Sequence, residues 1–358
     1  MKKELDFKVQ FSAFCGMTFI NCFSSVYIFL ENIGSKYRDG DLCGKSGCDN
    51  CGYCGNDGGY FFLFDTMCGR SSLRCRFNGE PTEMEKMIGQ TDFYDGGTDN
   101  NIEFLFGFAG YEYCQINEPE FFKNEIKASI DIGKPVIAKV KAGSGRFRVI
   151  TGYDGDALIY PDFANAQQKP QNAPSYEDLD IIYIIGEKIE PRYMLTDGLK
   201  RIRQVMEYNI NEKLWDGYIE KMGLYTADSL NNCNIEEKKA RMKRVADTMW
   251  HTFNCHNFAE VFRKYLGDGN SALYDKIGDM KKLRAPEFQE LLGKISGPCC
   301  GYTHDLAWAL IGLEECADWS KHAAGYFGEM VELTLCQLAK NDAEALDAIK
   351  KMIELLER

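Results

Sequence analysis

The chain has 358 residues, of which 45% are hydrophobic and 27% are charged. This composition is typical of a globular protein, and the length allows two domains with separate cores. The formal net charge of −12 argues against nucleic acid or an anionic membrane as the main partner, because both would repel an acidic protein.

The first residues of the chain lack the pattern of an export signal. Charged side chains at Glu4, Asp6 and Lys8 stand where a signal peptide carries an apolar run. The uncharged stretch over residues 11–30 approaches the length of a membrane span, but serine and asparagine side chains interrupt it, which favours a buried helix. Fifteen cysteines without an export signal indicate reduced thiols and a cytoplasmic location.

The stretch Gln10–Gly34 carries no charge as far as Leu30, so a helix here must be buried on nearly every side. Ser12 is the predicted N-cap, and Gly34 stands where a left-handed C-cap belongs. These caps place Cys15 in the first helical turn, where unpaired amide N–H groups and the helix dipole favour a thiolate. The alternative is that Cys15 is a small buried core residue.

Hydrophobic patterns predict a mixture of helices and strands up to about residue 192. The clearest helix is Pro119–Gly133, where apolar residues are spaced four apart and a glycine can cap the end. A short helix is expected at Thr82–Met87, whereas Glu103–Tyr113 fits a helix or a strand. The expected strands are Tyr60–Asp65, Pro135–Val140, Phe147–Tyr153, Ala157–Tyr160 and Ile181–Ile185.

From Tyr193 onward the pattern is helical. The expected helices are Asp197–Tyr208, Glu212–Met222, Ile235–Leu266, Ser271–Ile277, Ala285–Ile295, Thr303–Cys316, Ser320–Leu338 and Asp342–Leu356. The sequence therefore predicts an α+β domain over residues 1–192 and an all-α helical bundle over residues 193–358. The sequence leaves two roles open for this bundle. One is a lid, and the other is a dimerisation surface through which the chain forms a homo-oligomer.

The segment Gly133–Asp162, GKPVIAKVKAGSGRFRVITGYDGDALIYPD, resembles the second half of papain-like cysteine peptidases of the bacteriocin-leader-processing type. It is also similar to the N-terminal domain of the butirosin biosynthesis acyltransferase family, which uses a cysteine nucleophile. These families follow a Gly-Lys-Pro-Val strand with a strand that begins at the catalytic histidine and ends in Gly-Tyr. Cys15–Gly16 matches the Cys-Gly near the start of their long helix. The resemblance covers roughly the first 190 residues and implies a papain-like α+β fold there.

Carried over onto this sequence, the resemblance assigns Cys15 as the nucleophile and Asp162 as the acidic residue that orients the base. The histidine position falls on Arg146, which stays protonated and cannot accept a thiol proton. An arginine can still stabilise a thiolate or bind an anion, so Arg146, with Tyr153 at the end of the motif, is a candidate ligand contact. Gln10 stands five residues before Cys15, one fewer than the usual spacing of the oxyanion-hole glutamine.

All four histidines lie in the second half of the chain, at His251, His256, His304 and His322. A replacement base would therefore have to reach Cys15 from the helical domain. His256 and His304 are the candidates, against the simpler interpretation that they are ordinary helix-face or cap histidines.

A separate feature is a C-x4-C-x2-C-x2-C pattern in a glycine-rich stretch, formed by Cys43, Cys48, Cys51 and Cys54. Four thiolates can enclose a zinc ion tetrahedrally. The first three also have the spacing of one ferredoxin class that holds an iron–sulfur cluster, in which the fourth ligand lies further along the chain, and Cys68 or Cys75 is the candidate for it here. A metal held by four cysteines would be structural, because no coordination position stays open. The alternative is a reduced cysteine-rich loop without metal.

The missing histidine favours a papain-like protein that is degenerate as a peptidase and binds a peptide or small anionic ligand near Cys15 and Arg146. One alternative is an active cysteine hydrolase or acyltransferase in which Cys15 attacks a thioester, ester or amide. The other is a metal-dependent interaction module built on residues 43–54.

Overall fold

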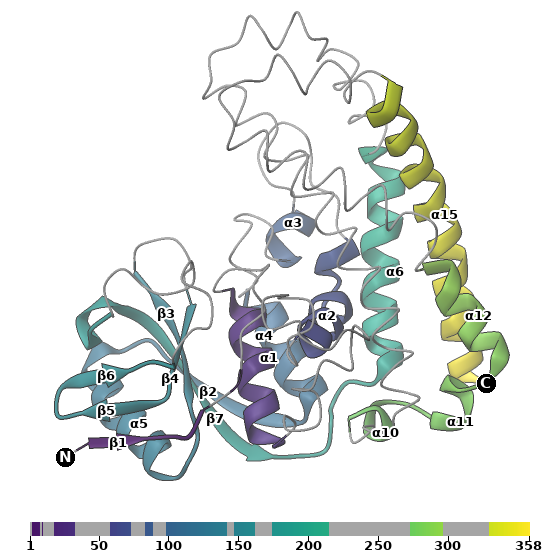
Figure 1. Cartoon of the computed structure of the whole chain (residues 1–358). Helices are drawn as coiled ribbons and strands as arrows, with labels where there is room; N and C mark the ends of the chain where they lie inside the picture. Colours follow the sequence, from purple (N-terminus) through teal and green to yellow (C-terminus); the bar gives the residue numbers. More distant parts are fainter. Residues whose placement is uncertain are drawn as a thin grey trace, which may run out of the picture. The chain divides into compact units, whose positions relative to one another are not determined.

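The computed structural model describes residues 2–7, 9, 18–32, 58–72, 83–88, 98–141, 147–161, 174–214, 273–295 and 329–358. These residues form helices and antiparallel sheets, which confirms the predicted mixed α+β class (Figure 1). Contacts divide the chain into two compact units. The first contains Met1–Phe64 and Asp92–Arg192, and the second contains Asp65–Thr91 and Tyr193–Arg358.

The first unit holds two antiparallel sheets. The four-stranded sheet has the order β2-β7-β3-β4, formed by Tyr111–Ile116, Leu179–Lys188, Val136–Val140 and Phe147–Ile150. The three-stranded sheet has the order β1-β5-β6, formed by Lys2–Glu4, Gly152–Asp154 and Ala157–Ile159. The predicted strand Phe147–Tyr153 is divided at Thr151, so its first part belongs to one sheet and its second part to the other.

Helix α5, Pro119–Asp131, packs on one face of the four-stranded sheet. It confirms the predicted amphipathic helix, because a proline stands at its first turn and Gly133 follows its end with φ 86°. The buried apolar residues of α5 are spaced four apart, and they pack against the strands. The core on this face consists of Phe122, Ile126, Ile130, Val136, Ala138, Ile150, Tyr153, Leu158, Leu179 and Ile182.

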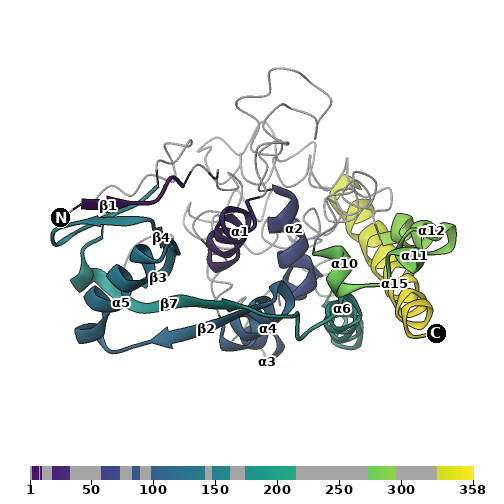
Figure 2. The same cartoon turned by 90° about the horizontal axis from the view of Figure 1, so that it is seen from below.

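The opposite face of the sheet carries Tyr183 and Phe147, and helix α1, Phe19–Leu30, packs against it. Successive strand residues point to opposite faces, which is why Ile182 meets α5 while Tyr183 meets α1. Figure 2 shows α1 beside α2, where Tyr27 and Phe64 form an edge contact at 5.3 Å. The first unit is therefore built from helices on both faces of one sheet.

The ends of α1 differ from the prediction. Its N-cap is Thr18, whose side chain accepts the Asn21 N–H at 3.1 Å, and not Ser12. The described helix begins at Phe19, and Cys15, which was expected in its first turn, lies outside the described residues. The last helical residue is Leu30, and the left-handed residue after it is Asn32, at φ 51°. Among the described residues, no helix has the length and apolar character that crossing a bilayer requires.

The apolar run at Tyr60–Asp65 forms helix α2, Gly58–Met67, and the predicted strand is wrong. A short uninterrupted apolar run fits a buried strand or a buried helix, and periodicity cannot separate the two. The helix is selected by packing, because Tyr60 and Phe64 lie one turn apart and both contact the ring of Tyr27.

The ambiguous region Glu103–Tyr113 contains a helix and a strand. Helix α4 spans Asp99–Ala109, with the Thr98 side chain accepting the Asn101 N–H, and Gly110 ends it at φ 76°. A Cβ at Gly110 would lie 2.6 Å from the carbonyl oxygen of Ile189, so only glycine fits this turn into β2.

All described elements of the second unit are helical. They are α3 at Glu83–Ile88, α6 at Leu195–Asn211, α10 at Tyr274–Ile277, α11 at Met280–Leu283, α12 at Pro286–Ile295 and α15 at Glu329–Glu357, with the 3-10 turn η1 at Arg70–Ser72. Helices α6 and α15 run antiparallel, since Lys200 pairs with Glu357 and Glu207 pairs with Lys350. The helix α15 is continuous through residues 339–341, where the sequence analysis placed a break.

Candidate functional site

Most of the predicted site residues lie outside the described residues. These are Gln10, Cys15, Arg146, Asp162 and the cysteines Cys43, Cys48, Cys51 and Cys54. Their assigned roles, including zinc or an iron–sulfur cluster on the cysteine pattern, stay predictions. Within the described part of the chain, no group of three His, Cys, Asp or Glu side chains gathers that could hold a metal ion.

Tyr153 is the one predicted ligand contact within the described residues. It lies on β5, and its hydroxyl donates to Oδ1 of Asp131 at 2.8 Å. The Lys127 ammonium lies 5.1 Å from the centre of its ring, and Lys3 pairs with the same Asp131 carboxylate at 3.4 Å. These contacts tie β5 to the end of α5 and to β1, and they occupy the Tyr153 hydroxyl.

The start of α1 and the start of β4 meet in an aromatic contact. Phe19 is the first residue of α1 and Phe147 is the first residue of β4, and their rings pack edge to face with centroids 5.4 Å apart. Both side chains are fully buried. In the sequence, Arg146 immediately precedes Phe147, and Cys15 precedes Phe19 by four residues.

The same two elements also carry a buried thiol and a buried guanidinium. The thiol belongs to Cys22 of α1, and the guanidinium belongs to Arg148 of β4. Burial raises the pKa of Cys22 to about 12, and the positive charge of Arg148 opposes that rise only partly. Arg148 is 8% exposed and its Nη1 donates to the carbonyl oxygen of Phe147 at 2.7 Å, while burial lowers its pKa. Because a thiolate is the nucleophilic form, Cys22 stays an inert thiol at neutral pH. The sequence analysis missed both residues, and no motif marks them.

The raised pKa of Cys22 makes the stability of the chain fall at alkaline pH. Between the ordinary value of 9.0 and about 12, the unfolded chain releases the thiol proton while the folded chain keeps it. The free energy of unfolding therefore decreases with rising pH in this window, by about 1.4 kcal/mol per pH unit for this thiol. Between pH 7 and pH 10 the free energy of unfolding should fall in both proteins. We expect the fall to be about 1.4 kcal/mol smaller in Cys22→Ala than in the wild type, measured by urea unfolding.

The matched control for this measurement is Cys114→Ala, because the Cys114 thiol is exposed to water in the folded chain. This variant should keep the pH dependence of the wild type. Equal slopes for Cys22→Ala and Cys114→Ala would contradict a titrating role for the buried thiol.

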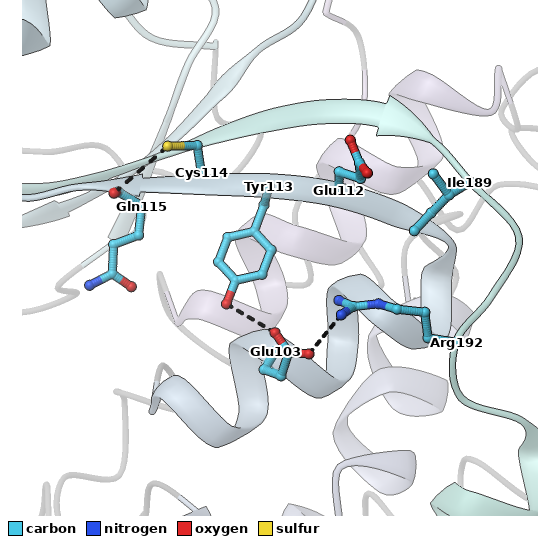
Figure 3. Close-up of a pocket in the computed structure, with 7 residues that line it drawn as sticks. All are labelled: Glu103, Glu112, Tyr113, Cys114, Gln115, Ile189 and Arg192. Atoms are coloured by element: carbon cyan, nitrogen blue, oxygen red, sulfur yellow. Dashed lines mark hydrogen bonds and ion pairs between the residues drawn. The ribbon is translucent and has the colours of Figure 1, made fainter.

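A pocket of about 570 Å³ lies along β2 in the first unit (Figure 3). It is lined by Glu103, Glu112, Tyr113, Cys114, Gln115, Ile189 and Arg192. Its volume is within the range of small-molecule sites. The pocket combines carboxylates, a guanidinium, a phenol, an amide and an exposed thiol, so it offers hydrogen bonds and charge more than apolar contact.

Glu103 is the centre of the polar network in this pocket. Its Oε1 pairs with Nη1 of Arg192 at 2.9 Å, and its Oε2 accepts the hydroxyl of Tyr113 at 3.4 Å (Figure 3). Burial raises the pKa of Tyr113, and the Glu103 carboxylate adds to the rise, so the phenol stays a donor at neutral pH. The ring of Tyr113 stacks on Phe106 of α4 at 4.4 Å, which fixes its direction.

No protein-family model, curated protein or solved structure matches this chain.

Proposed function

We propose that the first unit is a papain-like domain that has lost peptidase chemistry and binds a peptide or small anionic ligand beside Cys15, with Arg146 as the anion contact. The observation that carries this proposal is the packing of Phe19 on Phe147, at 5.4 Å between ring centroids. It brings the N-terminus of a buried helix to the first residue of a sheet strand, which is where the resembled families hold their cysteine and their histidine.

Chain connectivity limits how far the two predicted residues can be from this contact. Four residues span at most about 14 Å, so Cys15 is tethered within that distance of Phe19. Arg146 is bonded directly to Phe147. The contact therefore supports a site in which a thiol and a guanidinium are neighbours.

The chemistry of this pair favours binding over peptide hydrolysis. A cysteine peptidase needs a base that takes the thiol proton and returns it to the leaving group, and imidazole does both near neutral pH. The first 192 residues contain no histidine. Arginine remains charged, so it can hold a carboxylate or phosphate and can stabilise a thiolate, but it cannot shuttle a proton.

Cys22 does not offer an alternative nucleophile in this region. It is fully buried, and its pKa is raised to about 12. Cys22 is therefore not a candidate for a nucleophilic or arginine-stabilised thiolate, and the proposal assigns that role to Cys15.

The test is the rate at which iodoacetamide alkylates Cys15 as a function of pH, read by peptide mass spectrometry. With Arg146 beside the thiol, we expect half-maximal rate below about pH 8 and slower alkylation in the presence of glutarate, a small dicarboxylate. Arg146→Gln should move the half-maximal rate to about pH 8.5 and remove the glutarate protection. Arg192→Gln is the matched control, since it removes an arginine of the same unit at the β2 pocket.

An ordinary thiol profile in the wild type, with no glutarate protection, would remove the proposed ligand site. Hydrolysis of N-acetylcysteamine acetyl thioester that disappears in Cys15→Ala would replace it with the active hydrolase or acyltransferase. Absence of that turnover, together with the Arg146-dependent profile, supports the degenerate binding domain.

A further inference from the structure

Among the described strands, none pairs with the outer edge of β2, and the pocket lies along this edge of the four-stranded sheet. Four consecutive residues line it, from Glu112 to Gln115, although successive strand side chains point to opposite faces. Figure 3 shows this alternation, with Glu112 and Cys114 on one side of the strand and Tyr113 and Gln115 on the other. A single pocket can touch all four only if it runs along the edge of the strand, beside the backbone.

The sheet order supports this geometry. Strand β2 is terminal in the order β2-β7-β3-β4, and Figure 2 shows it at the border of the sheet. Its inner partner is β7, yet the strand residues of β7 do not line the pocket. Backbone N–H and C=O groups at such an edge can pair with an added extended segment.

The pocket charges select a basic occupant. The Glu103 carboxylate is already paired with Arg192, so Glu112 is left as the negative charge that an incoming side chain meets. Glu112 is exposed and stands on the opposite side of β2 from Tyr113. A lysine or arginine on the added strand, directly across from Glu112, would form a favourable cross-strand pair.

A second copy of this chain fits the edge less well than a basic partner. Two copies paired through β2 would bring a second Glu112 to the same short edge, and each copy carries a net charge of −12. Like charges across paired strands are destabilising. The length of β2, six residues, matches an added segment of about 20 Å.

We propose that the open edge of β2 is a strand-addition site for an extended, basic segment of a partner protein, with Glu112 as the charge contact. The polar network of Glu103, Tyr113 and Arg192 forms one wall, and the exposed Cys114 thiol lies at the centre of the edge. This site is separate from the ligand site proposed beside Cys15 and does not depend on it.

The experiment is selection of random heptapeptides by display on the wild-type chain, with Glu112→Lys as the counter-selection target. We expect enriched peptides to be basic and rich in β-branched residues. The best one should bind Glu112→Lys about tenfold more weakly than the wild type. Glu344→Lys, an exposed charge reversal on α15, is the matched control and should bind within about twofold of the wild type.

Two further readouts separate strand addition from simple charge attraction. Methylation of alternate backbone nitrogens of the peptide should abolish binding, because it removes the edge hydrogen bonds. The peptide should slow alkylation of Cys114 about fivefold and leave Cys336, the exposed thiol of α15, unchanged.

Selection of no peptide, equal binding to Glu112→Lys, tolerance of backbone methylation, or unprotected Cys114 would each overturn the proposal. Arg146→Gln should leave this binding intact, so a failure of the ligand site beside Cys15 can be told apart from a failure here.

Discussion

Replacing Arg70 by methionine is expected to lower the free energy of unfolding by about 3–5 kcal/mol, because it removes one partner of a buried ion pair. Asp65 is fully buried and Arg70 is 4% exposed, and Nη1 of Arg70 lies 3.3 Å from Oδ1 of Asp65. Removing one partner of a buried ion pair leaves part of the desolvation cost of the other charge uncompensated.

The pair sits in a network at the end of α2. The Sγ of Cys68 donates to the Asp65 carbonyl oxygen, and the guanidinium of Arg201 on α6 donates to the Cys68 carbonyl oxygen at 3.2 and 3.3 Å. The side-chain amide of Asn209 donates to the carbonyl oxygen of Ser72. Loss of Arg70 should therefore loosen the attachment of η1 to α6 as well as remove the ion pair between Arg70 and Asp65.

The measurement is urea unfolding of Arg70→Met beside Lys86→Met. Lys86 pairs with Glu83 in the same unit, but both side chains are largely exposed, so its loss should cost less than about 1 kcal/mol. The double variant Asp65→Leu with Arg70→Met removes both charges and should recover much of the loss. Equal effects of Arg70→Met and Lys86→Met would show that the buried pair contributes no more than a surface one.

Local pattern was enough to predict the elements whose buried stripe has a clear period. Helix α5 was predicted because its apolar residues recur every fourth position and a glycine follows, and β3 was predicted because a short apolar run starts at a proline. Helix α2 was mistaken for a strand because it is buried on most sides and shows no stripe. The predicted break between Leu338 and Asp342 is wrong, because α15 runs through these residues and no glycine or proline interrupts the helix there.

The polar groups of the candidate sites could not be predicted because their partners are distant in sequence. Glu103 lies on α4 and Arg192 follows the end of β7. Their side chains form an ion pair, but no spacing rule relates two positions so far apart in the sequence. Cys22 and Arg148 carry shifted pKa values only because the fold buries them together. Cys15 was singled out by the helix-cap pattern and by the resemblance, and Arg146 by the resemblance alone. Both lie outside the described residues.

Phe19→Ala is the second substitution with a large expected effect, about 3–5 kcal/mol in the free energy of unfolding. The Phe19 ring is fully buried and packs against Phe23, Phe106, Phe147 and Tyr183, with centroids 5.4–6.4 Å away. Its removal leaves a cavity where α1, α4, β4 and β7 converge. Phe121→Ala, on the exposed side of α5 at 51% exposure, is the control and should change stability by less than about 0.5 kcal/mol.

Phe19→Leu turns the same position into a test of the proposed ligand site. Leucine keeps most of the buried volume, so the variant should fold with a loss of about 1 kcal/mol. It removes the edge contact that sets the start of α1 against the start of β4. If that contact positions Cys15 beside Arg146, half-maximal alkylation of Cys15 should shift toward the pH of an ordinary thiol, although neither charged group has been changed. An unchanged alkylation profile in folded Phe19→Leu would show that Phe19 stabilises the core without positioning the thiol.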